Sequence, residues 1–140
     1  MSANAFAFYR GTAALMAADL AAGPSSGILV ASCGDAHVSN FGFYASPERD
    51  LVMDLNDFDE AHPGGWEWDL RRLVASIWVA GRQNGAGESD CESAARQCVA
   101  AYRTEVRELA RTPLLARSYQ RIDVDHLHKT TSNPSLRQEI

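Results

Sequence analysis

The stretch CGDAHVSN, residues 33–40, decides how the rest of the chain is interpreted. It closes a short apolar run, Gly27–Cys33, which has the length of a strand and turns abruptly polar at Gly34. Such a pattern predicts a strand that ends in a functional loop. A second polar stretch, DLNDFDE at residues 54–60, follows another strand candidate at residues 50–55. Two polar loops at strand ends are therefore expected near each other.

The spacing of Asp35 and Asn40 matches the D-x-x-x-x-N pattern of a kinase catalytic loop. Phosphoryl transfer needs a carboxylate that orients the attacking hydroxyl, and oxygen ligands that hold Mg²⁺ against the phosphates. Mg²⁺ keeps several waters, so one carboxylate and one amide from the protein are enough. A triplet resembling D-F-G, Asp57-Phe58-Asp59, stands near the end of the next strand.

The elements around these loops predict an α+β fold. A helix is expected over residues 4–22, a hairpin from strands at 41–44 and 50–55, and an acidic loop over 56–66. Apolar positions between residues 67 and 83 recur with helical spacing and predict a well-buried helix. The S-x-x-E box at Ser89 predicts a helix to about Arg111 with Val99, Tyr102, Val106 and Leu109 as its core face.

Composition narrows the class of protein. The chain has 140 residues, enough for one domain, and 13 basic against 18 acidic residues give a formal net charge of −5. Without a basic run, a nucleic-acid partner is not expected. No stretch is long and apolar enough for a membrane span, and three cysteines without C-x-x-C spacing suit neither a disulfide framework nor a zinc site. A cytoplasmic protein is expected.

Linked motifs give a resemblance to known families. GDAHVSN resembles the G-D-x-H-x-x-N loop of aminoglycoside phosphotransferases and choline-kinase-like kinases, and NDFDEA with WEWDLRRL resembles their later segments. The strings FYRG, CGDAHVSNFG, LNDFDEA, WEWDLRRLVAS and VAGR, in this order, resemble the bacterial family DUF2252, which is generally placed among kinase-like folds. The resemblance implies a kinase-like C-lobe whose small antiparallel hairpin carries catalytic and metal loops packed by helices.

The resemblance also implies roles for individual residues. Asp35 would be the catalytic base, and Asn40 and Asp57 would be metal ligands. His37 would give a supporting hydrogen bond, and Asp69 would brace the catalytic loop. Asp54 and Asp59 are supporting candidates, and Asp54 competes with Asp57 for the metal because it better fits the short gap expected after Asn40.

Two features depart from the kinase pattern. Cys33 stands where those kinases commonly have histidine, and no glycine-rich loop followed by a strand-borne lysine precedes Asp35, since the first lysine is Lys129. We therefore expect residues 1–119 to form the catalytic-loop segment and the polar residues 120–140 to be a truncated end. The exposed apolar surface would then favour oligomers.

Structural alternatives stand beside these assignments. Asp35 and Asn40 could form an Asx-turn pair, and the acidic set of Asp54, Asp57, Asp59 and Glu60 could be a solvated loop or could bind a cation that relieves its repulsion.

Arg10 could reach a phosphate or pair with Asp19. Trp66 and Trp68 could pack or form a ligand platform, and His126 and His128 could chelate a metal adventitiously.

Two functions remain open at this stage. The first is an ATP- and Mg²⁺-dependent phosphotransferase that acts on the hydroxyl of an unknown small molecule. The second is a truncated or degenerate kinase-like protein that binds metal or a partner without turnover. Besides these two functions, a purely structural helical module is a third interpretation.

Overall fold

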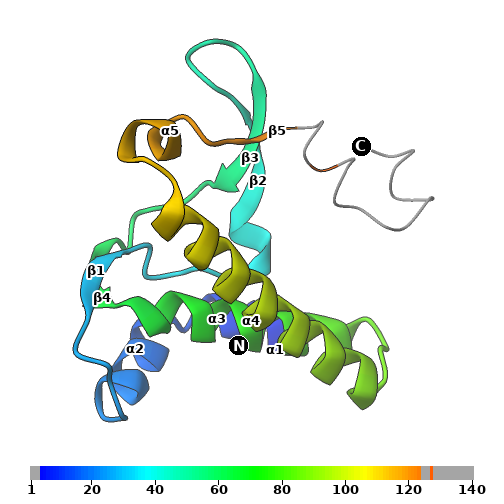
Figure 1. The fold of residues 1–140 in the computed structure, drawn as a ribbon. Coiled ribbons are helices and arrows are strands. Elements are labelled where there is room, and N and C mark those ends of the chain that lie inside the picture. Colours follow the sequence, from blue (N-terminus) through cyan, green and yellow to red (C-terminus); the bar gives the residue numbers. More distant parts are fainter. Residues whose placement is uncertain (1–3, 124–126, 128–140) are drawn as a thin grey trace.

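The computed structural model describes residues 4–123 and residue 127, and it shows a mixed α+β arrangement around one central helix. This helix is α3, Trp66–Gln83. It contacts α1 (Ala5–Arg10), α2 (Ala13–Ala21) and α4 (Glu88–Arg111). Figure 1 shows α4 crossing α3 and the strands β2 and β3 rising away from the helices.

Two small antiparallel sheets flank the polar loops. In the first, β1 (Leu29–Ser32) pairs with β4 (His62–Gly65). In the second, β2 (Phe41–Ala45) pairs with β3 (Leu51–Leu55), and β5 (Ile122–Asp123) adds to the other edge of β3. The loop after β1 leads through a short 3-10 helix, η1 (Val38–Asn40), into β2. Since β3 leads through the second loop into β4, both loops run between the two sheets.

Several expected elements are confirmed. The hairpin of β2 and β3 forms, and α3 and α4 lie within a residue of their predicted bounds. The fold is α+β with small antiparallel sheets, as expected. No helix in the described part of the chain combines the length and apolar character needed to cross a bilayer.

The prediction of one helix over residues 4–22 is wrong, because this segment forms two helices, α1 and α2, that are separated at Gly11 and Thr12. The physical reason lies in the backbone carbonyls of Tyr9 and Arg10. Both accept hydrogen bonds from the side chain of Arg72, at 3.0 and 3.2 Å. A continuing helix would direct these carbonyls to the N–H groups four residues later. At Arg10 the tertiary contact therefore takes the place of the helical bond, while the Tyr9 carbonyl also accepts from Thr12, three residues later, at 3.2 Å.

Other boundaries also differ from expectation. The acidic loop was predicted to extend to residue 66, but His62–Gly65 forms β4. A short helix, α5 (Leu114–Ser118), was not predicted. The prediction of a capping box at Ser89 is wrong, because α4 begins at Glu88, with Gly87 as its N-cap residue and no side-chain hydrogen bond at this end. His126, His128 and the segment 129–140 lie outside the described residues.

The apolar faces of α3 and α4 are less buried than the sequence predicts. The apolar side chains of α3 are only half-buried, and its most buried residues are polar, namely Glu67, Arg72 and Ser76. On α4, the expected core positions Val99, Tyr102 and Val106 are exposed. Tyr102 stacks on Trp66 with its ring 5.8 Å away, but no described element covers the outer part of this face.

The crossing of α3 and α4 gives a testable packing contact. A Cβ added at Gly81 would lie 2.8 Å from the buried Cys91 sulfur. Gly81→Ala would gain about 1 kcal/mol of helix propensity, but overpacking costs about 1–3 kcal/mol. We expect a net loss of stability in denaturant unfolding. In a Cys91→Ala background the same substitution should become neutral or stabilising, and an equal loss in both backgrounds would contradict this packing.

Candidate functional site

A polar stripe on α3 holds the loop of residues 33–40. The stripe is formed by Asp69, Arg72 and Ser76, which lie on one face because their spacing is three and four residues. Asp69 accepts hydrogen bonds from the backbone N–H groups of Cys33 and Gly34, at 2.7 and 3.0 Å. The Ser76 hydroxyl accepts one from the N–H of Val38 at 3.0 Å and donates one to its own helix.

Arg72 connects this loop to the N-terminal helix. Its Nε donates to Oδ1 of Asp35 at 2.5 Å, and its guanidinium lies 4.6 Å from the centre of the Tyr9 ring. The Tyr9 hydroxyl donates in return to the Arg72 carbonyl at 2.7 Å. Only 2% of Arg72 is exposed. A charge buried this deeply needs such a complete set of partners.

The loop conformation depends on a glycine. Gly34 has φ +84°, a left-handed conformation that other residues rarely adopt. A Cβ at this position would also collide with the backbone carbonyl of Glu60, in the second loop. The two loops meet again where the Cys33 thiol donates to the Asp57 carbonyl, with sulfur and oxygen 3.3 Å apart, and where Asn56 N–H donates to Asn40 O at 2.8 Å.

Asp35, Asn40 and Asp57 line one cavity of about 290 Å³. The other lining residues are Ala7, Arg10, Gly11 and His37. The amide nitrogen of Asn40 donates to the Asp35 carbonyl at 2.8 Å. Because only the nitrogen can donate, this bond fixes the orientation of the amide and leaves its oxygen as an acceptor. Asp57 uses Oδ1 to accept from the N–H of Asp59 at 3.1 Å.

His37 lies beside the Asp35 carboxylate on the inside of the protein. Its Nε2 lies 3.5 Å from Oδ2 of Asp35, and only 1% of the residue is exposed. Burial lowers the pKa of the His37 imidazole, and the charges of Arg10 and Arg72 act in the same direction, while Asp35 opposes them. The neutral ring is therefore favoured. The ring of Phe6 covers it edge-on at 6.1 Å.

The remaining predicted acidic residues do not converge on this cavity. Asp54 lines a different cavity, beside the sheet of β2, β3 and β5. The side chain of Asp69 is committed to the loop backbone. Within the described residues, no group of three or more His, Cys, Asp or Glu side chains is placed to share a metal ion. Cation binding by the acidic set of residues 54–60 therefore stays a prediction, without a cluster of three such side chains in the described residues.

The aromatic residues and Arg10 have clear positions. Trp66 stacks on Tyr102 and donates to the Ser26 hydroxyl at 2.9 Å, so it packs and does not form a platform at the cavity. Trp68 contacts His62. Among the described residues, Arg10 and Asp19 make no ion pair with each other or with another residue.

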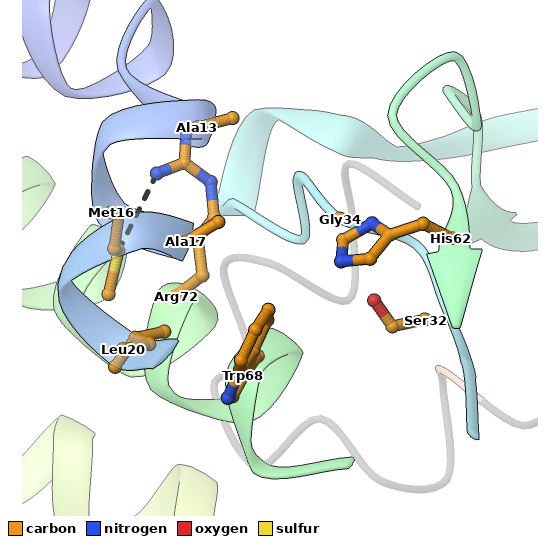
Figure 2. A pocket seen from close by; sticks show the side chains of 9 residues that line it. All are labelled: Ala13, Met16, Ala17, Leu20, Ser32, Gly34, His62, Trp68 and Arg72. Atoms are coloured by element: carbon orange, nitrogen blue, oxygen red, sulfur yellow. Dashed lines mark hydrogen bonds between the residues drawn. The ribbon is translucent and has the colours of Figure 1, made fainter. Parts of the chain in front are cut away.

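A much smaller cavity, of about 10 Å³, lies between α2 and the first sheet. Figure 2 shows Ser32 and His62 on one side of it and Met16 and Arg72 on the other. The Ser32 hydroxyl is buried without a hydrogen-bond partner among the described residues. This volume is close to the minimum for a single water molecule. The cavity is therefore a packing feature and not a ligand site.

Sequence reasoning missed Arg72, Ser76 and Tyr9, which hold the site together. The available signal was the spacing of Asp69, Arg72 and Ser76, which puts three polar residues on one helical face. The adjacent apolar face of the same helix concealed it, because apolar periodicity is the stronger pattern.

Comparison with known families assigns the chain to a bacterial family. The model of DUF2252, described as an uncharacterized protein conserved in bacteria, matches residues 1–140. The chain therefore belongs to the DUF2252 family. No curated protein and no solved structure matches it.

Gly34→Ala should disrupt the site by destabilising the fold. The substitution combines left-handed strain with a backbone collision, so we expect a loss of about 3 kcal/mol or more in the free energy of unfolding. Gly27→Ala is the matched control, because Gly27 also has positive φ, +76°, but open space around it. Its loss should be only about 1–2 kcal/mol. Equal losses in denaturant unfolding would contradict the loop packing.

The buried His37 predicts a pH dependence of stability. Its pKa is lower in the folded protein than the ordinary value of 6.5, so the unfolded chain binds the proton more readily. The buried neutral imidazole of His37 therefore contributes its full stabilisation above pH 6.5. This contribution is lost as the pH falls from 6.5 towards the pKa of the folded protein. Denaturant unfolding at several pH values should show this loss.

His37→Gln should flatten this dependence, because it removes the buried imidazole. His62→Gln should retain it, because His62 lies on the rim of the smaller cavity and is only half-buried. The same slope in all three proteins would show that another group is responsible.

Proposed function

We propose that this chain carries the phosphotransfer site of a kinase-like small-molecule kinase, with the fold of a kinase C-lobe around it. The observation that carries the proposal is the shared cavity of Asp35, Asn40 and Asp57. These residues come from two loops, and they are the ones that the resemblance to aminoglycoside phosphotransferases assigns to the base and the metal.

Asp35 would accept the proton of the acceptor hydroxyl. Arg72 holds Oδ1, and His37 lies nearest Oδ2, so the carboxylate is fixed in one orientation. A general base gains from such orientation, because the acceptor oxygen must approach in line with the transferred group. The hydrogen bonds that the loop backbone donates to Asp69 keep the loop itself in place.

Asn40 and Asp57 fit a hard divalent cation. The amide oxygen of Asn40 is left as an acceptor by the bond of its nitrogen, and Asp57 has one carboxylate oxygen outside its turn. Mg²⁺ takes such oxygen ligands and retains waters for the remaining positions. Bound Mg²⁺ would neutralise charge on the phosphates of ATP. The placement of Asp54 in another cavity favours Asp57 as the ligand.

A second function remains a candidate because of the Asp35 ion pair. The carboxylate is already paired with a buried arginine, which suits a structural role as well as a catalytic one. The chain also lacks a lysine before Lys129. A degenerate kinase-like protein would bind metal or a partner at this cavity without turnover.

Three matched substitutions separate these functions. We expect Asp35→Asn to lower ADP formation from ATP by about 10²-fold or more, since a general base contributes at least this factor. Asp57→Asn should weaken Mg²⁺ binding measured by calorimetry. Asp54→Asn makes the same charge change in the other cavity and should alter neither quantity.

The results distinguish the two functions and test the choice of metal ligand. Binding of Mg²⁺ and ATP without any ADP formation, even with added hydroxyl compounds, would favour the non-catalytic protein. Binding of neither ligand would contradict both the metal and the nucleotide assignments. Weakening of Mg²⁺ binding by Asp54→Asn but not by Asp57→Asn would reverse the choice of ligand.

A further inference from the structure

The cavity of Asp35, Asn40 and Asp57 has one cationic side chain that the kinase resemblance does not assign. Arg10 is the last residue of α1, and it lines this cavity with the two carboxylates. Its guanidinium makes no ion pair within residues 4–123, although Asp35 and Asp57 line the same space. The charge of Arg10 is therefore available to a ligand.

The backbone of Arg10 is fixed relative to the proposed base. Arg72 donates to the carbonyl of Arg10 from Nη2 and to the carboxylate of Asp35 from Nε. One buried guanidinium thus sets where α1 ends relative to Asp35. The side chain of Arg10 takes no part in these bonds, so it is held at the cavity by its main chain alone.

The chemistry of the cavity indicates what Arg10 would bind. Two carboxylates alone would repel an anion, but an arginine among them supplies a planar fork that matches phosphate oxygens. A volume of about 290 Å³ is at the lower limit for a complete drug-sized ligand. It therefore suits the phosphate end of a larger molecule.

We propose, on the basis of the phosphotransfer function above, that Arg10 binds the phosphoryl oxygens of a polyphosphate in this cavity. Arg10 would be a binding residue that holds the phosphate chain near Asp35, while the metal ligands lie on Asn40 and Asp57. The polyphosphate could be that of a nucleotide or a free inorganic chain, and both offer the same oxygens.

The test measures binding of tripolyphosphate, ATP and inorganic phosphate by calorimetry in the presence of Mg²⁺. Charge-assisted hydrogen bonds contribute about 1.5–3 kcal/mol, so Arg10→Gln should weaken tripolyphosphate binding about 10- to 150-fold. Arg10→Lys should recover part of the loss, since it keeps the charge without the fork. Arg71→Gln is the matched control, because Arg71 is exposed and lines a separate groove between α3 and α4.

Two further readouts keep a folding effect apart from a binding effect. Arg10→Gln retains the carbonyl that Arg72 uses, so its thermal unfolding midpoint should match the wild type. Its affinity for Mg²⁺ alone should not fall, because the substitution removes a positive charge from the cavity of the proposed metal ligands. If ATP binds much more tightly than tripolyphosphate and both depend on Arg10, the ligand is a nucleotide, and equal affinities indicate an inorganic chain.

The inference is overturned if Arg10→Gln and Arg71→Gln bind tripolyphosphate equally well, or if the wild type binds none. It is also overturned if succinate competes better than tripolyphosphate, because the anion would then be a carboxylate. Mg²⁺ binding that depends on Asp57 would survive each of these results. The failure of this inference is therefore distinguishable from failure of the proposed metal site.

Discussion

The rest of the structure depends on the ion pair and the hydrogen bonds that the buried guanidinium of Arg72 makes. It joins the end of α1, the sulfur of Met16 in α2 and the carboxylate of Asp35, all from one position on α3. Removing one partner of a buried ion pair costs about 3–5 kcal/mol, because the other charge is left uncompensated. Since a small domain has only about 5–15 kcal/mol of stability, this one cluster is a large part of what holds the helices around the loop.

Asp69 and Ser76, the other residues of the polar stripe on α3, also hold their neighbours through polar contacts. Few large apolar side chains are buried in the described part of the chain, where the buried apolar residues are Cys33, Ala36, Val52 and Cys91. The loop is therefore positioned largely by hydrogen bonds that its N–H groups donate to the side chains of Asp69 and Ser76. Such bonds are directional, and a buried N–H group without a partner is costly. The loop is consequently held in one conformation by a helix that meets its backbone at several points.

The sequence predicts the parts of this structure that have a regular period. The hairpin of β2 and β3 and the helices α3 and α4 follow from local patterns. The spacing of Asp35 and Asn40 matches one motif, but Asp54 fits the gap after Asn40 better than Asp57, which lines the cavity with them. The strand β4 has the sequence HPGG, whose proline and glycines favour a turn, and only its pairing with β1 makes it extended. The break between α1 and α2 arises from a contact with a residue more than sixty positions away, which no local pattern contains. Strand alternation explains the position of Asp54, since it lies two residues after the buried Val52, shares its face and lines the same cavity.

The cysteine that departs from the kinase pattern has a structural role in this arrangement. Cys33 lies directly before the loop glycine, and its thiol donates to the carbonyl of Asp57. Burial raises the pKa of this thiol, and the carboxylates of Asp69, Asp35 and Asp57 raise it further. The sulfur therefore keeps its proton and remains a donor. A neutral donor joins the two loops without adding a charge that would compete with Arg72 for Asp35, so the electrostatics of the cavity are left to Arg10 and the two aspartates that line it.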